Sequence, residues 1–196
     1  MLYGISGRSL NDPASQTIVP IYKRTVSTSV ATVDIENTDL DWTYWDSVIF
    51  KIRRLAVVTD DVEIYLRVYD TTLAAWQSDA TDYQFNGVMV AGSTAGATFG
   101  SGDPEISMMN GIGATFGVGN GAGEAFDCNI EIHQPFTAGL SGIHWQAGWV
   151  DSTGNISSSQ GWGYYTTPNP ISGLRILAES GNIDDCKIMG FGVRGY

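Results

Sequence analysis

The chain has 196 residues and a net charge of −11, with 24 glycines and only 16% charged side chains. A chain of this length buries roughly 70% of its unfolded surface, so it can form a stable core without disulfides or structural metal ions. Its basic residues form no cluster larger than a pair such as Arg53-Arg54, which argues against nucleic-acid and anionic-membrane binding because both need clustered positive charge.

The first twenty residues, Met1 to Pro20, show weak periodicity and contain the turn signal Asn11-Asp12-Pro13. We expect them to form an N-terminal arm that packs on a neighbouring subunit, ahead of one β-sandwich domain over residues 21–196. The first half of that domain is predicted to contain strands at Ile21–Thr25, Ser29–Ile35, Val48–Leu55, Val62–Asp70 and Tyr83–Val90.

The clearest strand pattern lies between Val48 and Tyr69. From Val62 onward, apolar residues alternate with polar or aromatic ones, and a period of two places one face of a strand on a core and the other in water. The acidic turn Thr59-Asp60-Asp61 is short, so we expect it to join the two strands as antiparallel neighbours.

A glycine-rich segment follows, from Gly92 to Gly123, with few charged residues. Each interior glycine costs a helix about 1 kcal/mol relative to alanine, so the segment cannot be helical. We expect a long loop that covers a subunit contact, with at most a short strand near Ile106–Met109. Its glycine spacing also misses the dinucleotide-binding fingerprint.

Regular strands resume after this segment, separated by explicit turns at 137–139, 151–155 and 180–182. Short strands with turns at such spacing indicate an all-β fold, a two-sheet antiparallel β-sandwich that is jelly-roll-like. The predicted strands of this half are Ala125–His133, Ile143–Val150, Gly161–Tyr165, Leu174–Ala178 and Lys187–Val193.

Histidines and cysteines are the first candidates for chemistry. His133 and His144 are both expected to face outward, and a metal site there would need further ligands, of which Glu131 is the obvious one. We prefer a pair of surface histidines, without metal or cofactor. Cys128 and Cys186 start strands, and two cysteines are too few to indicate an oxidised framework, so we expect free thiols.

Carboxylate pairs are the second candidates, because glycoside hydrolysis uses two of them. All three pairs lie in predicted turns, where aspartate is favoured by its hydrogen bonds to the backbone. No Gly-x-Ser-x-Gly motif is present either, so we predict no catalytic residue and no enzymatic activity. The pairs are Asp60-Asp61, Asp79 with Asp82, and Asp184-Asp185.

Three groups of aromatic residues, two of them in predicted loops, are the most promising contacts. Such rings stack on sugars or become hot spots at protein interfaces. By contrast, Trp145 and Trp149 fit inward positions of a strand. The candidate glycan or interface contacts are Trp42, Tyr44, Trp45, Trp76, Trp162, Tyr164 and Tyr165.

Three segments together resemble the small β-sandwich accessory proteins of tailed-phage virions, which form head decorations, spikes or fibres. The chain departs from that pattern at Cys128 and Cys186, where small turn residues are usual, and at Gly190, where a larger apolar residue is expected. The segments are TYWDSVIFKIRRLAVVTDDVEIYLRVYDTTLAAWQSDATDYQF, EAFDCNIEIHQPF with IHWQAGWVDSTGN, and a closing hairpin ISGLRILAESGNIDDCKIMGFGVRGY in which Ser-Gly-Asn joins the last two strands.

The resemblance implies a non-enzymatic virion structural protein that decorates the capsid or forms part of a head spike or tail fibre. Its partners would be copies of itself, as a trimer, and virion proteins such as the major capsid protein. The start MLYGISGRSLND lacks the features of a secretory signal, which fits assembly in the host cytoplasm. The alternative is a host-surface glycan-binding domain that uses the loop aromatics.

Overall fold

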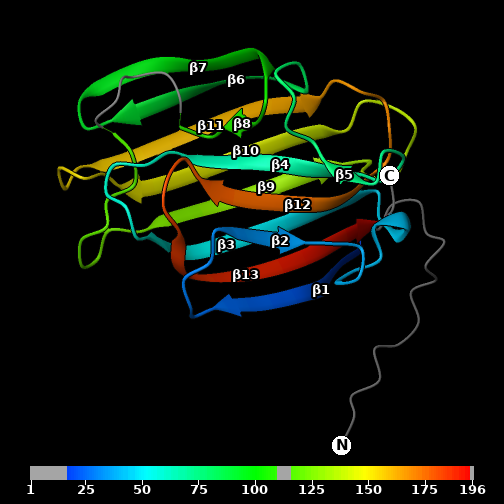
Figure 1. Cartoon of the computed structure of the whole chain (residues 1–196), viewed down its shortest axis with the longest axis horizontal. Coiled ribbons are helices and arrows are strands. Elements are labelled where there is room, and N and C mark those ends of the chain that lie inside the picture. The colour runs from blue at the N-terminus through cyan, green and yellow to red at the C-terminus, as the bar shows by residue number, and fades with distance from the viewer. Residues whose placement is uncertain (1–16, 110–115, 195–196) are drawn as a thin grey trace, which may run out of the picture.

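The computed structural model describes residues 17–109 and 116–194, which form two antiparallel β-sheets packed face to face (Figure 1). The expected all-β sandwich is confirmed. The larger sheet has the order β1 (Thr17–Val26), β13 (Ile183–Arg194), β3 (Ser47–Val57), β9 (Phe126–His133), β10 (Gly142–Val150), β11 (Ile156–Tyr165), β6 (Tyr83–Ala91) and β7 (Thr94–Asp103). The smaller sheet has the order β2 (Thr32–Ile35), β12 (Ile171–Ala178), β4 (Ile64–Asp70) and β5 (Ala75–Trp76), with β8 (Ile106–Ser107) also paired to β4.

The core lies between the two sheets and follows the predicted alternation. In β4, Ile64, Leu66 and Val68 are fully buried, while the residues between them are partly exposed. Trp145 and Trp149 point inward from β10, as expected. A single-turn helix, η1 (Trp42–Tyr44), follows β2, and none of the described residues forms a helix with the length and hydropathy needed to cross a bilayer.

The predicted hairpin between the strands at Val48 and Val62 is wrong. Strand β3 pairs with β13 and β9 in the larger sheet, whereas β4 pairs with β12 and β5 in the smaller one, so the connection crosses between sheets. Alternation shows only that one face of each strand is buried, and two strands facing each other across a core satisfy it as well as two paired neighbours do. The acidic turn instead holds residues 117–120, because Asp61 accepts a hydrogen bond from the Gly117 N–H (2.8 Å) and Asp60 from the Asn120 N–H (3.2 Å).

The last two strands show the same difference. The turn at 180–182 joins β12 of the smaller sheet to β13 of the larger sheet, so they are not a closing hairpin. Three consecutive strands, β9, β10 and β11, do pair as antiparallel neighbours, as their short turns predicted. In the turn between β10 and β11, Asp151 accepts hydrogen bonds from the N–H groups of Thr153 and Asn155, each at 2.9 Å.

The glycine-rich segment is not the long loop that we expected. Its first part forms the ten-residue strand β7, which pairs with β6 along its whole length. Ala91 pairs with Thr94, so the loop between the strands is Gly92-Ser93, and Gly92 takes the positive φ of +55° that such a tight turn requires. Residues 110–115 of the segment lie outside the described residues.

Two smaller predictions concern the arm and the thiols. Residues 17–20 of the expected arm belong to strand β1, which pairs with β13, and the rest of the arm lies outside the described residues.

Cys128 and Cys186 are free and buried, on β9 and β13, with β3 between them. Gly190, where a larger residue was expected, leaves room for Tyr22 and Phe50, because a β-carbon there would lie 2.8 Å from Cβ of Tyr22.

Candidate functional site

The side of the larger sheet that faces away from the core carries a mixture of amide, aromatic and basic side chains. We call it the outer face. Because the strands are in register, its side chains form rows across the sheet. One row contains Asn129, Gln146 and Gln160 on β9, β10 and β11, which we call the amide row, and continues to Val88 on β6.

Trp162 is the prominent ring of the outer face. It lies on β11, opposite His144 on β10, and is 45% exposed. A β-carbon on the neighbouring Gly142 would lie 2.2 Å from Cζ2 of Trp162, so the indole lies over the backbone of β10 at a position that has no side chain. The glycine therefore lets a large ring rest on the sheet while nearly half of its surface stays open to solvent.

Both histidines flank this ring. His133 stacks on Trp162 with 5.1 Å between ring centroids and 28° between planes, and His144 lies 6.1 Å away at 36°. The two histidines therefore lie near each other on the outer face, as expected, with Trp162 packed against both. Glu131 accepts a hydrogen bond from the Ser47 hydroxyl (2.9 Å), and its carboxylate is 3.8 Å from Nδ1 of His133. The described residues contain no group of three or more His, Cys, Asp or Glu side chains arranged to hold a metal ion.

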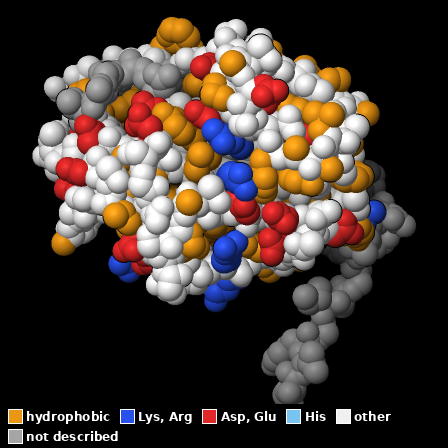
Figure 2. All heavy atoms as spheres, viewed as in Figure 1, with side chains coloured by type: hydrophobic (Ala, Val, Ile, Leu, Met, Phe, Trp, Pro, Cys, Tyr) orange, Lys and Arg blue, Asp and Glu red, His pale blue; other side chains and the backbone are white. Residues whose placement is uncertain are grey.

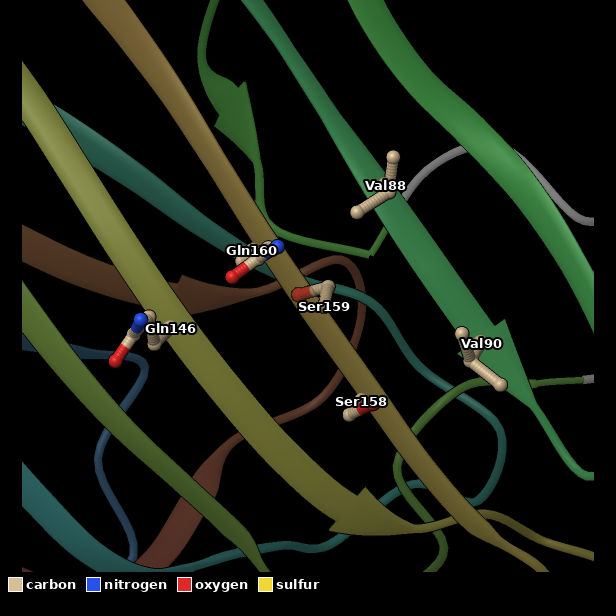
Figure 3. A pocket seen from close by; sticks show the side chains of 6 residues that line it. All are labelled: Val88, Val90, Gln146, Ser158, Ser159 and Gln160. Atoms are coloured by element: carbon tan, nitrogen blue, oxygen red, sulfur yellow. The ribbon is translucent and has the colours of Figure 1, made fainter.

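Open hollows adjoin Trp162 along the amide row. One, of about 480 Å³, is lined by Trp162, His144 and Gln160 together with β6. The next, of about 330 Å³, brings Gln146 and Gln160 together with Val88 and Val90, as Figure 3 shows. A third hollow, of about 290 Å³, lies beside Gln146 toward β9 and includes Arg53. These hollows adjoin one another, because the first two share Gln160 and Val88 and the last two share Gln146.

The predicted aromatic contacts fall into three groups, and the first is on the outer face. Trp162 and Tyr164 lie there on β11, in the part of the strand that was predicted as Gly161–Tyr165. Tyr164 is half-buried and donates a hydrogen bond from its hydroxyl to Gln84 (2.5 Å). Tyr165, one residue further, points inward because side chains alternate along a strand, and its hydroxyl donates to the buried Asp70 at 2.8 Å.

The second group is buried. Trp42 is 1% exposed and packs against Phe50, and Tyr165 is also 1% exposed, so neither can meet a ligand on the folded surface. Trp42 and Tyr165 are therefore removed from the set of candidate contacts. Trp45 is half-buried, and its ring covers Gly192 on β13, where a β-carbon would lie 2.2 Å from Cδ2 of the indole.

The third group engages arginines elsewhere on the molecule. The guanidinium of Arg194 lies 4.2 Å above the ring of Tyr44, which is 48% exposed. On the outward side of the smaller sheet, Arg175 lies 4.3 Å above the ring of Trp76 and forms an ion pair with Asp34 at 2.6 Å. Each of these two rings is therefore covered on one face by an arginine of the same chain.

Charges on the smaller sheet's outward side are arranged in pairs. Figure 2 shows this side, with Lys and Arg side chains following one another down its middle next to Asp and Glu. Arg67 contacts Glu105 at 2.6 Å, as Arg175 does Asp34. Both arginines of this sheet are therefore paired with carboxylates.

The carboxylate pairs and the thiols considered as candidates for chemistry are placed where they support the fold. Asp82 accepts a hydrogen bond from the Asp79 N–H at 2.7 Å, which closes a turn, as Asp60 and Asp61 do for residues 117–120. Burial raises the pKa of the Cys128 thiol strongly and that of Cys186 to about 11, so neither is a thiolate at neutral pH.

Sequence reasoning did not identify the amide row as part of the site. Asn129, Gln146 and Gln160 each occupy an outward position between inward residues of their strands, and that alternation was visible in the sequence. Such positions are usually filled by charged residues on a sheet that faces only water. That the three amides form one row follows from the pairing of β9, β10 and β11.

No protein-family model and no curated protein matches the sequence. The resemblance to phage accessory proteins therefore stays a prediction. What the chain binds must be argued from the chemistry of its own surface. Among the described surfaces, the outer face combines an exposed ring, hydrogen-bonding amides and open hollows.

Proposed function

We propose that this chain is a non-enzymatic recognition protein that binds a polysaccharide on the outer face of its larger sheet. The observation that carries the proposal is Trp162, an indole that is 45% exposed, lies over Gly142 and stands two residues from Gln160 of the amide row on the same strand. This is the glycan-binding alternative that the sequence suggested, with the binding surface on the face of a sheet.

The chemistry of sugars fits this arrangement. A pyranose ring has an apolar C–H face that packs on an indole, and its hydroxyls both donate and accept hydrogen bonds. Asn and Gln side chains present a donor and an acceptor together, so they match such hydroxyls without a net charge. The hollows between Gln146, Gln160 and Val88 give depth for a chain of sugars.

The test is a comparison of two tryptophans on opposite faces. Trp162→Ala removes the proposed platform, and Trp76→Ala removes a ring of the smaller sheet as a matched control. Both variants and the parent protein are applied to a glycan array and then titrated by calorimetry with the best polysaccharide. We expect Trp162→Ala to weaken binding by at least about tenfold, as loss of a central aromatic contact does.

The control variant should bind within about twofold of the parent, since a surface outside a binding site contributes little to affinity. Equal losses in both variants, with both still folded by circular dichroism, would place recognition elsewhere. Absence of any glycan binding would refute the proposal. Release of new reducing ends from a bound polysaccharide would refute its non-enzymatic part.

A second candidate function is that of a subunit in a larger assembly such as the phage virion that the resemblance suggests. Strand β7 is an edge of the larger sheet and has no partner on its outer side among the described residues. It has no proline and no charge before Asp103, and its Phe99 is 72% exposed. The opposite edge, β1, carries Pro20, Lys23 and a register shift, which are features that block edge pairing.

An assembly role predicts that charge on β7 changes the oligomeric state. Phe99→Lys places a cation on this edge without touching the core, and Leu73→Lys, at an exposed position in another loop, is its control. Light scattering after size exclusion should show the parent as an oligomer, a trimer by the resemblance, and Phe99→Lys as a smaller species. A monomeric parent at high concentration would refute self-assembly.

A further inference from the structure

The outer face holds all three lysines of the chain, gathered at one end of the sheet. Lys23 on β1 and Lys51 on β3 lie on either side of Met189 in one row, and Lys187 on β13 lies opposite Arg53 in the next. We call these four cations the lysine end. Since the whole chain has a net charge of −11, their concentration on one part of one face is a departure from the average surface.

The three lysines form no ion pair among the described residues. The ion pairs formed within residues 17–109 and 116–194 involve arginine or histidine, and none involves a lysine. The ammonium of Lys51 lies 5.2 Å from the centre of the Phe191 ring, which supports its stem on the sheet. Lys23 and Lys187 are exposed to solvent.

Arg53 connects the lysine end to the amide row. Its guanidinium donates to the backbone carbonyl of Cys128 (3.0 Å) and to Oδ1 of Asn129 (2.8 Å), so it is fixed against β9. It also lines the hollow beside Gln146. A fixed guanidinium that still has free N–H groups is well suited to bind an anionic oxygen, because binding then costs little further side-chain entropy.

Carboxylates near this end are partly engaged by the protein. Asp127 accepts a hydrogen bond from the Arg54 N–H (2.7 Å), and Glu131 accepts one from Ser47 (2.9 Å). Asp184 and Asp185 lie at the beginning of β13, outside the row of Lys51 and the amides. The row itself contains lysines and amides but no acid.

The distance between the lysine end and Trp162 sets the length of ligand that could contact both. Strands β9 and β10 lie between Lys51 on β3 and Trp162 on β11, so these residues are separated by about 14 Å at the usual strand spacing. We infer that the polysaccharide is acidic and lies across the strands, with carboxylate or sulfate groups at the lysine end and a sugar face on Trp162. This inference rests on the proposed function, and it adds the chemical class of the ligand.

The experiment compares acidic and neutral polymers on the intact chain. Polygalacturonate, alginate and heparin are titrated against dextran and glucomannan, and duplex DNA and phosphatidylserine vesicles serve as other polyanions. The variant Lys23→Gln/Lys51→Gln/Lys187→Gln removes the ammonium groups. Its control, Asn37→Asp/Thr38→Glu/Ser78→Glu, makes the same change in net charge at exposed loop positions away from the outer face.

We expect the parent to prefer at least one acidic polysaccharide over both neutral ones, with affinity that falls as salt rises. The triple lysine variant should lose about tenfold in affinity for it, as three exposed charge contacts would, while the control loses far less. Trp162→Ala should lose binding as well. Together these results require charge and stacking at one site.

Failure of the inference and failure of the proposed function give different results. Equal affinity for neutral polymers, lost in Trp162→Ala but unchanged in the triple variant, overturns the acidic ligand and leaves glycan binding standing. Binding of no polysaccharide overturns both. If DNA or vesicles bind as tightly as the acidic polysaccharide and Trp162→Ala leaves their binding unchanged, the inference is overturned. The lysine end would then attract any polyanion without specificity.

Discussion

Two glycines of the larger sheet allow a sharp test, because each makes room for a tryptophan on a different side. A β-carbon on Gly142 would lie 2.2 Å from Cζ2 of Trp162, and a β-carbon on Gly161 would lie 2.2 Å from Cζ2 of Trp145. The clashes are equal in distance. Trp162 is 45% exposed, whereas Trp145 is fully buried. The substitutions Gly142→Ala and Gly161→Ala therefore differ mainly in where the displaced ring can go.

In Gly142→Ala the indole of Trp162 can rotate toward solvent. What is lost is chiefly its contact with His133, and an aromatic pair contributes about 1 kcal/mol. In Gly161→Ala the buried Trp145 has no free space, and the new β-carbon would also lie 2.5 Å from the backbone carbonyl oxygen of Asn86. Overpacking of this kind costs about 3 kcal/mol.

Thermal denaturation followed by circular dichroism measures both costs. For a domain of this size, about 1 kcal/mol corresponds to about 3 °C in melting temperature, so Gly161→Ala should melt about 9 °C below the parent and Gly142→Ala within about 3 °C. Gly142→Ala should also change the tryptophan fluorescence and weaken glycan binding. Equal destabilisation of the two variants, or unchanged fluorescence in Gly142→Ala, would show that Trp162 does not rest on β10.

Three further predictions concern buried or crowded groups. The pKa of Glu63 is raised by burial and by the charges of Glu179 and Glu105, so Glu63→Gln should stabilise the fold at pH 7 by up to about 1 kcal/mol. This gain should shrink as the pH falls, because Glu63 of the folded parent protein then becomes protonated. A lower melting temperature of the variant at pH 7 would contradict this prediction. Burial acts to raise the pKa of Asp151, but hydrogen bonds from Thr153, Asn155 and Ser157 outweigh it and lower the pKa. The stability that this carboxylate contributes is therefore present above its unfolded pKa and is lost as the pH falls through the lower folded value. Asp151→Ala should cost about 2 kcal/mol at pH 7 by urea denaturation and much less at the acid end of that window, and an equal cost at both pH values would refute the assignment. Cys128 and Cys186 should react with a thiol reagent only when the protein is unfolded, and both thiols should then be titrated without added reductant. Rapid reaction of the native protein would show an exposed thiol.

The sequence was most informative where structure is local. Period-two alternation identified β4, β9 and β10, because burial of one strand face leaves a direct trace in residue order. Only the second half of β11, from Gly161 to Tyr165, was predicted, because its first half buries serines. The turn containing Asp151 was identified because its hydrogen bonds lie within five residues. These features need no knowledge of the rest of the chain.

Long-range pairing was not determined in the same way. Alternation in β3 and β4 could not distinguish a hairpin from two strands in opposite sheets, since a buried face does not specify its partner. Strand β7 was missed because glycine is unfavourable in both helices and strands, while the pairing that stabilises this one comes from β6.

The candidate site was predicted in part. Trp162 was named, but the grouping of neighbours in sequence mixed it with Tyr165, although a strand at 161–165 places those two rings on opposite faces. Trp42 was grouped with Tyr44 on the same grounds and lies in the core. The contribution of Gly142, which lets Trp162 rest on β10, depends on a cross-strand contact that sequence order does not contain.

The most direct measurement is a nuclear magnetic resonance titration of the labelled chain with an acidic oligosaccharide, such as a polygalacturonate fragment. The indole N–H of Trp162 and the side-chain amides of Asn129, Gln146 and Gln160 report on the outer face, and the indole N–H of Trp76 reports on the opposite one. Our account predicts saturable shifts of the first group while Trp76 stays unchanged. Shifts confined to Trp76 and its neighbours, or none at millimolar ligand, would contradict it.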